Sequence, residues 1–134
     1  MQKPVTFLLF DGRAEEAINY YMSVFSNSYI LQIAHHEKTA AFALPNIQLA
    51  TVVLGGQPFM FIDSVVKHDF SFTPAMSIYI NCDTEEEINA IYTKLSAGGN
   101  IFMPLEAYPF SKRFCWLSDK FGVSWQLNLF EPVG

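Results

Sequence analysis

The chain has 134 residues, of which 51% are hydrophobic and 16% aromatic, and its formal net charge is −5. This length and apolar content suit one domain with a packed core. The longest basic run is the pair Lys112-Arg113, and no stretch of about 18 apolar residues occurs, so we expect neither a nucleic-acid partner nor a membrane span.

Two cysteines, Cys82 and Cys115, stand in no spacing typical of a metal or redox site. We therefore expect two buried free thiols, which fits a reducing compartment. The N-terminal segment has one lysine and a short apolar run before Asp11, too short for the apolar core of a signal peptide. Together these features predict a cytoplasmic protein.

The first half of the chain begins as a strand followed by a helix. A short apolar run stops at Asp11-Gly12, and the next segment has helical spacing with two glutamates in its first turn, where the helix dipole favours negative charge. A turn is expected at 37–39 and another at Gly55-Gly56. The expected elements are a strand at 5–10, a helix at 14–25, and strands at 29–36, 39–44, 47–54 and 58–62.

The second half repeats this pattern after a polar segment at 63–74, which we interpret as a linker or long loop. Thr84 and Glu87 have the spacing of a capping box, and Gly98-Gly99 is typical of a helix C-cap. The expected elements are a strand at 76–82, a helix at 84–97, and strands at 101–105, 113–117 and 123–129.

The repeated pattern indicates an internal duplication. Asp11 and Asp83 each end the first strand of a copy, and the two copies are offset by about 71 residues. The sequence therefore predicts a single α+β domain over residues 1–134, built from two β-α-β-β-β modules at about 4–63 and 75–130.

Three segments carry a resemblance to a known family. FDGRAEEAINYYMSVF (Phe10–Phe25), EEEINAIYTKLSAGG (Glu85–Gly99) and WLSDKFGVSWQLNLF (Trp116–Phe130) resemble the PhnB-like group, also labelled 3-demethylubiquinone-9 3-methyltransferase-like. This group belongs to the vicinal oxygen chelate superfamily, which has the glyoxalase/bleomycin-resistance fold. The resemblance covers Val5–Phe130 and implies a cup-shaped sheet made by both modules and, as in many relatives, a homodimer.

The resemblance also implies four positions for metal ligands, on the first and last strands of each module. In this chain those positions hold Thr6, Met60, Ser77 and Gln126, where Gln126 replaces the Glu of a D-x-x-G-x-x-x-E pattern. A register shift of one step would bring Pro4 or Met76 into two of them. Neutral Thr, Met, Ser and Gln side chains cannot form a tight site for a divalent transition metal, so we expect no metal cofactor.

Three further side chains could supply ligands to a metal ion. Asp63 lies just beyond Met60, and His35 and His36 are adjacent on an expected strand, so that their side chains point to opposite faces. Asp119 fits better as a turn residue that binds local N–H groups than as a catalytic acid.

A small-molecule site follows from the same positions. If Gln126 faces the cup, alternation places Ser124 and Asn128 there too. On the neighbouring strand either Phe114 and Trp116 or Cys115 and Leu117 face the same way, and the sequence does not decide between them. The predicted ligand-binding residues are Thr6, Met60, Ser77, Trp116, Ser124 and Gln126.

Three functions are compatible with this pattern. The first is a metal-free protein that binds a small molecule in the cup. The second is a metal-dependent lyase, isomerase or dioxygenase whose ion is held by an unexpected set such as Asp63 with a histidine. The third is a structural dimer with a vestigial cup. Methyltransferase and hydrolase activities are not expected, because the chain has no glycine-rich nucleotide loop and Ser124 has no recognisable His-Asp partner.

Overall fold

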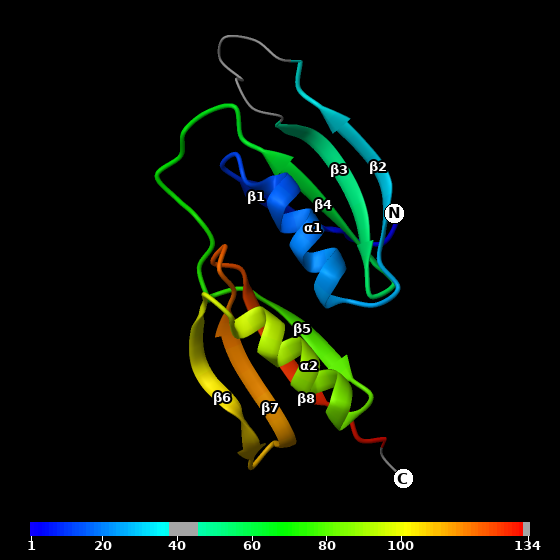
Figure 1. The fold of residues 1–134 in the computed structure, drawn as a ribbon, viewed down its shortest axis with the longest axis vertical. Helices are drawn as coiled ribbons and strands as arrows, with labels where there is room; N and C mark the ends of the chain where they lie inside the picture. Colours follow the sequence, from blue (N-terminus) through cyan, green and yellow to red (C-terminus); the bar gives the residue numbers. More distant parts are fainter. Residues whose placement is uncertain (38–45, 133–134) are drawn as a thin grey trace. The chain divides into compact units, whose positions relative to one another are not determined.

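The computed structural model describes residues 1–37 and 46–132. The chain divides after His68 into two compact units, and the described residues of each are treated separately (Figure 1). The strand expected at 39–44 lies outside the described residues. Within the described residues, no helix is long and apolar enough to cross a membrane.

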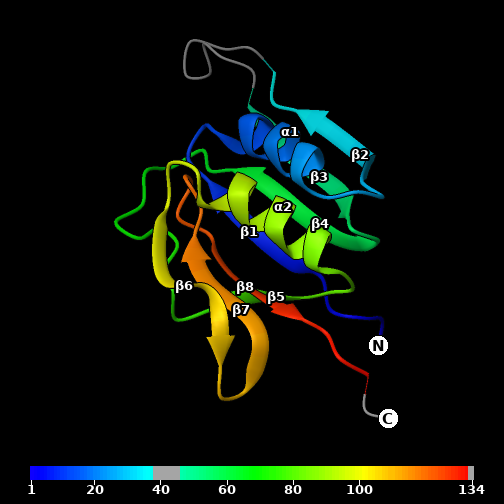
Figure 2. The same ribbon diagram turned by 60° about the horizontal axis from the view of Figure 1, so that its bottom comes forward.

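The first unit is a four-stranded sheet with one helix against it (Figures 1 and 2). The strands lie in the order β1-β4-β3-β2, with β1 parallel to β4 and the other neighbours antiparallel. Its elements are β1 (Thr6–Phe10), α1 (Ala14–Val24), β2 (Tyr29–His35), β3 (Ile47–Leu54) and β4 (Gln57–Asp63).

Packing of α1 on the sheet forms the core of this unit. Tyr21 of α1 is fully buried, and its ring centroid lies 6.1 Å from that of Phe61 on β4. Phe61 in turn stacks on Phe10 of β1 at 5.8 Å. Burying each such ring contributes about 2–3 kcal/mol relative to leaving it in water. The hairpin between β3 and β4 turns at Gly55 and Gly56, whose positive φ angles of 59° and 84° suit a tight hairpin turn.

The second unit repeats the same topology. Its strands lie in the order β5-β8-β7-β6, again with the first strand parallel to the last and the other pairs antiparallel. This equivalence confirms the predicted internal duplication. The elements are β5 (Ser77–Cys82), α2 (Glu85–Ser96), β6 (Asn100–Tyr108), β7 (Ser111–Ser118) and β8 (Ser124–Leu129).

Helix α2 has the predicted cap. The Thr84 hydroxyl accepts a hydrogen bond from the Glu87 amide at 3.1 Å, and the Glu87 carboxylate accepts one from the Asp83 amide at 3.0 Å. After the helix, Gly98 has a φ of 76°, as expected of a C-cap glycine. The helix begins and ends where these signals predicted.

Two strands are longer than the sequence predicted. Strand β6 runs to Tyr108 instead of residue 105, and β7 begins at Ser111 instead of residue 113. Register shifts interrupt their pairing, and Pro104 lies within β6, so the side-chain alternation that marks a strand in sequence is broken there. Residues 64–76, which follow β4, contain neither helix nor strand.

Candidate functional site

The two faces of the second sheet differ in what covers them. Trp125 and Leu127 of β8 are fully buried on the α2 side, and their register partners Leu117 and Cys115 are equally buried. Arg113 of β7 lies on that side as well, because its guanidinium donates to the side chain of Asn89 on α2. Alternation therefore places the intervening residues on the opposite, helix-free face. The helix-free face consists of Ser77, Tyr79, Asn81, Phe114, Trp116, Ser124, Gln126 and Asn128.

This arrangement resolves the alternative that the sequence left open. Phe114 and Trp116 share a face with Ser124 and Gln126, while Cys115 and Leu117 pack toward α2. The predicted alternation of Ser124, Gln126 and Asn128 is confirmed by the register of β8 with β7.

Four of the predicted site residues are joined by hydrogen bonds on the helix-free face. The hydroxyls of Ser77 and Ser124 lie 2.7 Å apart, although 47 residues separate them in sequence. The Trp116 indole Nε1–H donates to Ser124 Oγ at 2.9 Å, and Gln126 Nε2 donates to Ser77 Oγ at 3.3 Å. The parallel pairing of β5 with β8 brings these side chains together.

A count of donors shows that this network is incomplete. Two serine hydroxyls carry two protons, and only one of them is used in the bond between Ser77 and Ser124. The bonds from Trp116 and Gln126 fill acceptor positions. Whichever serine donates, one hydroxyl proton remains, and Gln126 Oε1 accepts no hydrogen bond from any described residue. The network therefore offers a donor and an acceptor to a ligand.

Aromatic rings surround the network. The ring of Phe102 on β6 lies 5.0 Å from that of Trp116, and the ring of Tyr79 lies 6.4 Å from that of Phe114. Phe114 also makes edge-to-face contacts with Tyr108 at 5.9 Å and Phe110 at 5.0 Å. Because Tyr79 is 53% exposed and Phe102 is 42% exposed, these rings are accessible as well as clustered.

A second pair of polar side chains lies further along β8. Asn128 Nδ2 donates to Asn81 Oδ1 at 3.0 Å, and the Ser111 hydroxyl donates to Asn128 Oδ1. These bonds use the carbonyl of both asparagines and fix the Asn128 amide in one orientation.

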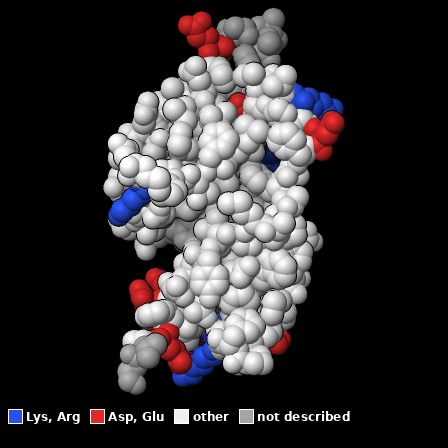
Figure 3. Space-filling model, turned by 180° about the vertical axis from the view of Figure 1, so that it is seen from behind, with Lys and Arg blue, Asp and Glu red and all other residues white. Residues whose placement is uncertain are grey.

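Few ionised groups lie on this side of the second unit. In Figure 3, which views the molecule from the side away from the helices of Figure 1, the charged side chains of the second unit gather toward its lower end and the remainder is white. The charged side chains near the network are Glu106, the strand partner of Phe114, and Lys112, which lies two residues before Phe114 and 3.4 Å from the Glu131 carboxylate. Uncharged polar groups and rings therefore dominate the helix-free face.

The predicted positions on the first sheet do not share a face. Thr6 pairs with Phe59 and alternates with Leu8 and Phe10, which pack on the α1 side, whereas Met60 pairs with Phe7 on the opposite side. The prediction that Thr6 and Met60 line the same face is therefore wrong, because the residue of β1 that shares a face with Met60 is Phe7. A shift of the strand register by one residue exchanges the two faces, and a run of apolar residues does not specify that register.

The Asp63 carboxylate is hydrogen-bonded to backbone amides of its own unit. Its side chain is only 1% exposed, and its two oxygens accept hydrogen bonds from the amides of Ala14 and Ile47, each at 2.9 Å. The carboxylate thus fixes the start of α1 and the start of β3. His35 lies elsewhere in this unit, 3.6 Å from the Glu15 carboxylate.

The residues at the predicted metal positions do not fit a metal of the kind that the superfamily implies. Gln126 directs its amide N–H at Ser77, and both side chains are neutral. Across residues 1–37 and 46–132, no three His, Cys, Asp or Glu side chains are grouped as metal ligands would be.

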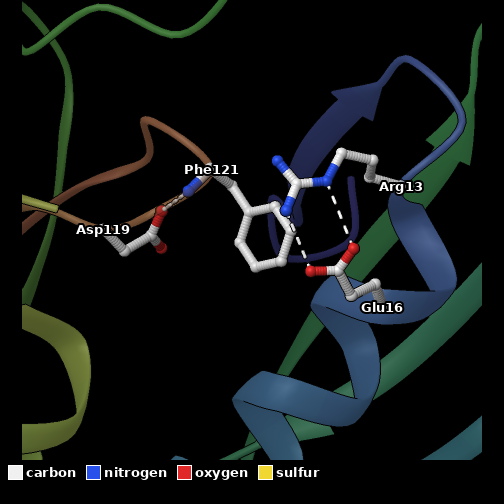
Figure 4. Close-up of polar contacts among 4 residues, drawn as sticks. All are labelled: Arg13, Glu16, Asp119 and Phe121. Carbon is white, nitrogen blue, oxygen red and sulfur yellow. Dashed lines mark hydrogen bonds and ion pairs between the residues drawn. The ribbon is translucent and has the colours of Figure 1, made fainter. Parts of the chain in front are cut away.

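Asp119 acts as a turn residue, as predicted. Its Oδ1 accepts a hydrogen bond from the amide of Phe121 at 2.8 Å (Figure 4). Oδ1 also accepts one from the Val123 amide at 3.1 Å, and Oδ2 accepts one from the Trp125 indole at 2.8 Å. The carboxylate fixes the turn before β8 and anchors Trp125 under α2. Figure 4 also shows the Arg13–Glu16 ion pair of the first unit, which lies at the exposed start of α1.

Both cysteines are free and buried, as predicted. Desolvation raises the pKa of Cys82 to about 12, helped by the nearby Glu87 carboxylate, and burial raises the pKa of Cys115 to about 11. Neither thiol is a thiolate near neutral pH, so neither is a candidate nucleophile.

Sequence reasoning missed Tyr79, Asn81 and Phe102. The first two could have been found by extending the alternation from Ser77 along the same strand. Phe102 could not, because the register shifts in β6 remove the alternation on which such a prediction depends.

Comparisons with known proteins agree with this architecture. A family model described as 3-demethylubiquinone-9 3-methyltransferase matches residues 2–128. The chain is similar to a PhnB protein from Bacillus cereus of known structure, with 53% identity, a TM-score of 0.91, and coverage of 96% of this chain and 100% of that one. It is also 25% identical to Protein YjdN of Escherichia coli K12 over 136 residues, 92% of each chain.

A more distant likeness concerns the fold alone. The fosfomycin resistance protein FosX from Listeria monocytogenes, solved with Mn(II) and 1S,2S-dihydroxypropylphosphonic acid, is 10% identical to the chain. Its TM-score is 0.66, and the match covers 97% of this chain and 93% of FosX.

Proposed function

The chain belongs to the PhnB-like family described as 3-demethylubiquinone-9 3-methyltransferase, within the vicinal oxygen chelate superfamily, and on this premise we propose that it binds a small uncharged organic molecule without a metal ion. Its α+β fold of two repeated modules is the glyoxalase/bleomycin-resistance fold. The binding surface in this proposal is the helix-free face of the second module.

The incomplete hydrogen-bond network carries the proposal. Ser124 is 2% exposed, whereas its partners in the network are only part-buried, so a ligand can reach the polar atoms that the network leaves unused. Here one serine proton and Gln126 Oε1 have no partner among the described residues, next to the half-buried ring of Trp116. A few directed polar groups set in an aromatic surface are the usual composition of a small-molecule site.

Metal-dependent chemistry is the weaker alternative for this chain. An ion that polarises a substrate oxygen needs anionic or imidazole ligands, and the helix-free face offers serine hydroxyls and carboxamides around Trp116. Asp63, the carboxylate that could have served as a substitute metal ligand, already accepts two backbone hydrogen bonds. Methyl transfer is not part of the proposal either, because neither sheet is the doubly wound parallel sheet on which S-adenosylmethionine enzymes bind their cofactor.

A ligand screen with a matched pair of variants tests the proposal. Metal-free protein, dialysed against a chelator, is screened by thermal shift against a library of neutral compounds, and hits are remeasured with Gln126→Ala and with Gln57→Ala. Gln57 is an exposed strand residue of the first unit, so its variant controls for loss of a glutamine as such. We expect hits that weaken about fivefold or more in Gln126→Ala and stay unchanged in Gln57→Ala.

Two results of this screen would contradict the proposal. One is an absence of hits for metal-free protein together with the appearance of hits after addition of Zn²⁺ or Mn²⁺. The other is a set of hits that weaken equally in both variants, which would place the ligand away from Gln126.

We also propose that the chain forms a homodimer in the cytoplasm. The edge strand β2 exposes the large apolar side chains of Tyr29, Ile30, Leu31 and Ile33, and exposed apolar edges favour association. The free thiols of Cys82 and Cys115 support the reducing compartment. Light scattering at micromolar concentration should give about twice the mass of 15.2 kDa and a smaller mass for Leu31→Lys. A wild-type monomer would contradict the dimer.

A further inference from the structure

We propose that the ligand of the helix-free face is a planar aromatic compound that carries a neutral amide edge, with a hydrogen-bond donor and an acceptor side by side, as in an aromatic lactam. This inference deepens the proposed function and rests on it. It follows from three independent properties of the face: its rings, its unused polar atoms and its small number of ionised groups.

The rings favour a flat, unsaturated ligand. Trp116 is held in orientation by the bond from its indole N–H to Ser124, so its face is presented without loss of side-chain freedom on binding. Phe102 lies against one part of this ring at an interplanar angle of 52°, which leaves the arrangement tilted and not stacked. Tyr79 and Phe110 are 53% and 65% exposed, so further ring surface is accessible. Contacts between aromatic rings stabilise a complex more than burial of the same apolar area alone.

The unused polar atoms favour an amide edge. The Gln126 amide is oriented by its bond to Ser77, so Oε1 is a fixed acceptor and the remaining serine proton is a nearby donor. Tyr79, the register partner of Gln126, has a hydroxyl that no described residue engages. A ligand with a single carbonyl or a single N–H would satisfy half of this set, whereas a lactam N–H and C=O satisfy both kinds of group.

The charges exclude an anion as the preferred ligand. Of the two basic residues of β7, Lys112 alternates with Phe114 and Trp116, but its ammonium is 3.4 Å from the Glu131 carboxylate. Arg113 is turned to the α2 side by its bonds to Asn89. Glu106, at the register position of Phe114, would repel a carboxylate or phosphonate brought near it. The uncharged surface in Figure 3 agrees with a neutral ligand.

Three probes, measured on metal-free wild-type protein, separate the contribution of the aromatic rings from that of the amide edge. Isoquinolin-1(2H)-one has both the rings and the lactam, 1-methoxyisoquinoline keeps the rings but has no N–H or carbonyl, and piperidin-2-one keeps the lactam without aromatic rings. We expect the first to bind with a Kd on the order of 0.1–1 mM by equilibrium dialysis, as suits so small a molecule. The other two should bind about tenfold more weakly or not at all.

Two variants and a control show whether the probe binds at the helix-free face. Trp116→Leu should weaken the binding of isoquinolin-1(2H)-one by about tenfold, and Gln126→Ala should do so by about fivefold, while Gln57→Ala should have no effect. Since the probe comparison is made on wild-type protein, a variant that folds poorly does not remove the test.

The outcomes distinguish this inference from the proposed function. Equal binding of 1-methoxyisoquinoline and isoquinolin-1(2H)-one would overturn the amide edge, and equal binding of piperidin-2-one would overturn the aromatic requirement. If none of the probes binds while the neutral library yields a ligand sensitive to Gln126→Ala, the ligand class is wrong and the proposed function stands. If neither probes nor library bind, both are overturned.

Discussion

Replacing Asp63 should destabilise the first module strongly, because one carboxylate satisfies two buried backbone donors. In Asp63→Ala, the amides of Ala14 and Ile47 would both lose their acceptors. An unsatisfied buried N–H costs about 1–3 kcal/mol, so the expected loss for two of them is about 2–6 kcal/mol. For a chain of 134 residues, 1 kcal/mol corresponds to about 3–4 °C in Tm, which gives a fall of roughly 6–24 °C.

Asp63→Asn should have a smaller effect. The carboxamide keeps one acceptor oxygen, so one of the two amides stays satisfied while the other faces an NH₂ group. We expect about 1–3 kcal/mol for this variant. Asp69→Asn, at an exposed position, is the matched control and should leave stability unchanged within about 0.5 kcal/mol.

Two assays check this prediction together. Thermal and urea unfolding give the loss of stability, and hydrogen exchange of the Ala14 and Ile47 amides reports the two bonds directly. Exchange at both amides should accelerate in Asp63→Ala and at one of them in Asp63→Asn. Stability of Asp63→Ala equal to that of Asp69→Asn, with a simultaneous loss of bound divalent metal, would refute the structural role and favour a metal ligand.

Three further predictions concern the second module. Thr84→Ala removes the acceptor at the start of α2 and should cost about 1 kcal/mol in urea unfolding; no change would show that the cap is dispensable. Gly99→Ala should cost about 1–3 kcal/mol or more, because an added methyl group would collide with the Ser118 carbonyl; a Tm equal to wild type would contradict this close approach. Cys82 and Cys115 should react with a thiol reagent at pH 8 at least about 100-fold more slowly than in unfolded protein, and rapid labelling would contradict their burial. The free energy of unfolding should also fall as pH rises from about 8.5, the pKa of an unfolded thiol, toward 11 to 12, because only the unfolded chain releases these protons in that range.

The duplication and most element positions could be predicted because their signals are local. Thr84 and Glu87 fix the start of α2 within four residues, and Gly98 ends it. The role of Asp119 is local as well, since its partners are the amides and the indole of the turn that it begins. The helical period and the turn glycines required no knowledge of distant contacts.

The remaining features depend on long-range contacts. Asp63 binds Ala14 from 49 residues away, and nothing in the sequence beside it indicates that partner. Phe114 and Cys115 are both apolar, so hydrophobicity alone could not show which faces α2, and that choice is made by packing with Leu127. Thr6 was assigned to the wrong face for the same reason, because every neighbour on its strand is apolar.

The two indole N–H signals of the protein provide the most direct test of metal-free binding on the helix-free face. Trp116 donates its indole proton to Ser124 on that face, whereas Trp125 donates its own to Asp119 on the α2 side, so the second signal is an internal control. In chelator-dialysed protein titrated with isoquinolin-1(2H)-one or a hit from the neutral library, ¹H–¹⁵N NMR should show a saturable shift of the Trp116 signal and a stationary Trp125 signal. A Trp116 signal that moves only after Zn²⁺ or Mn²⁺ is added, or that stays fixed while a ligand binds, would contradict the account.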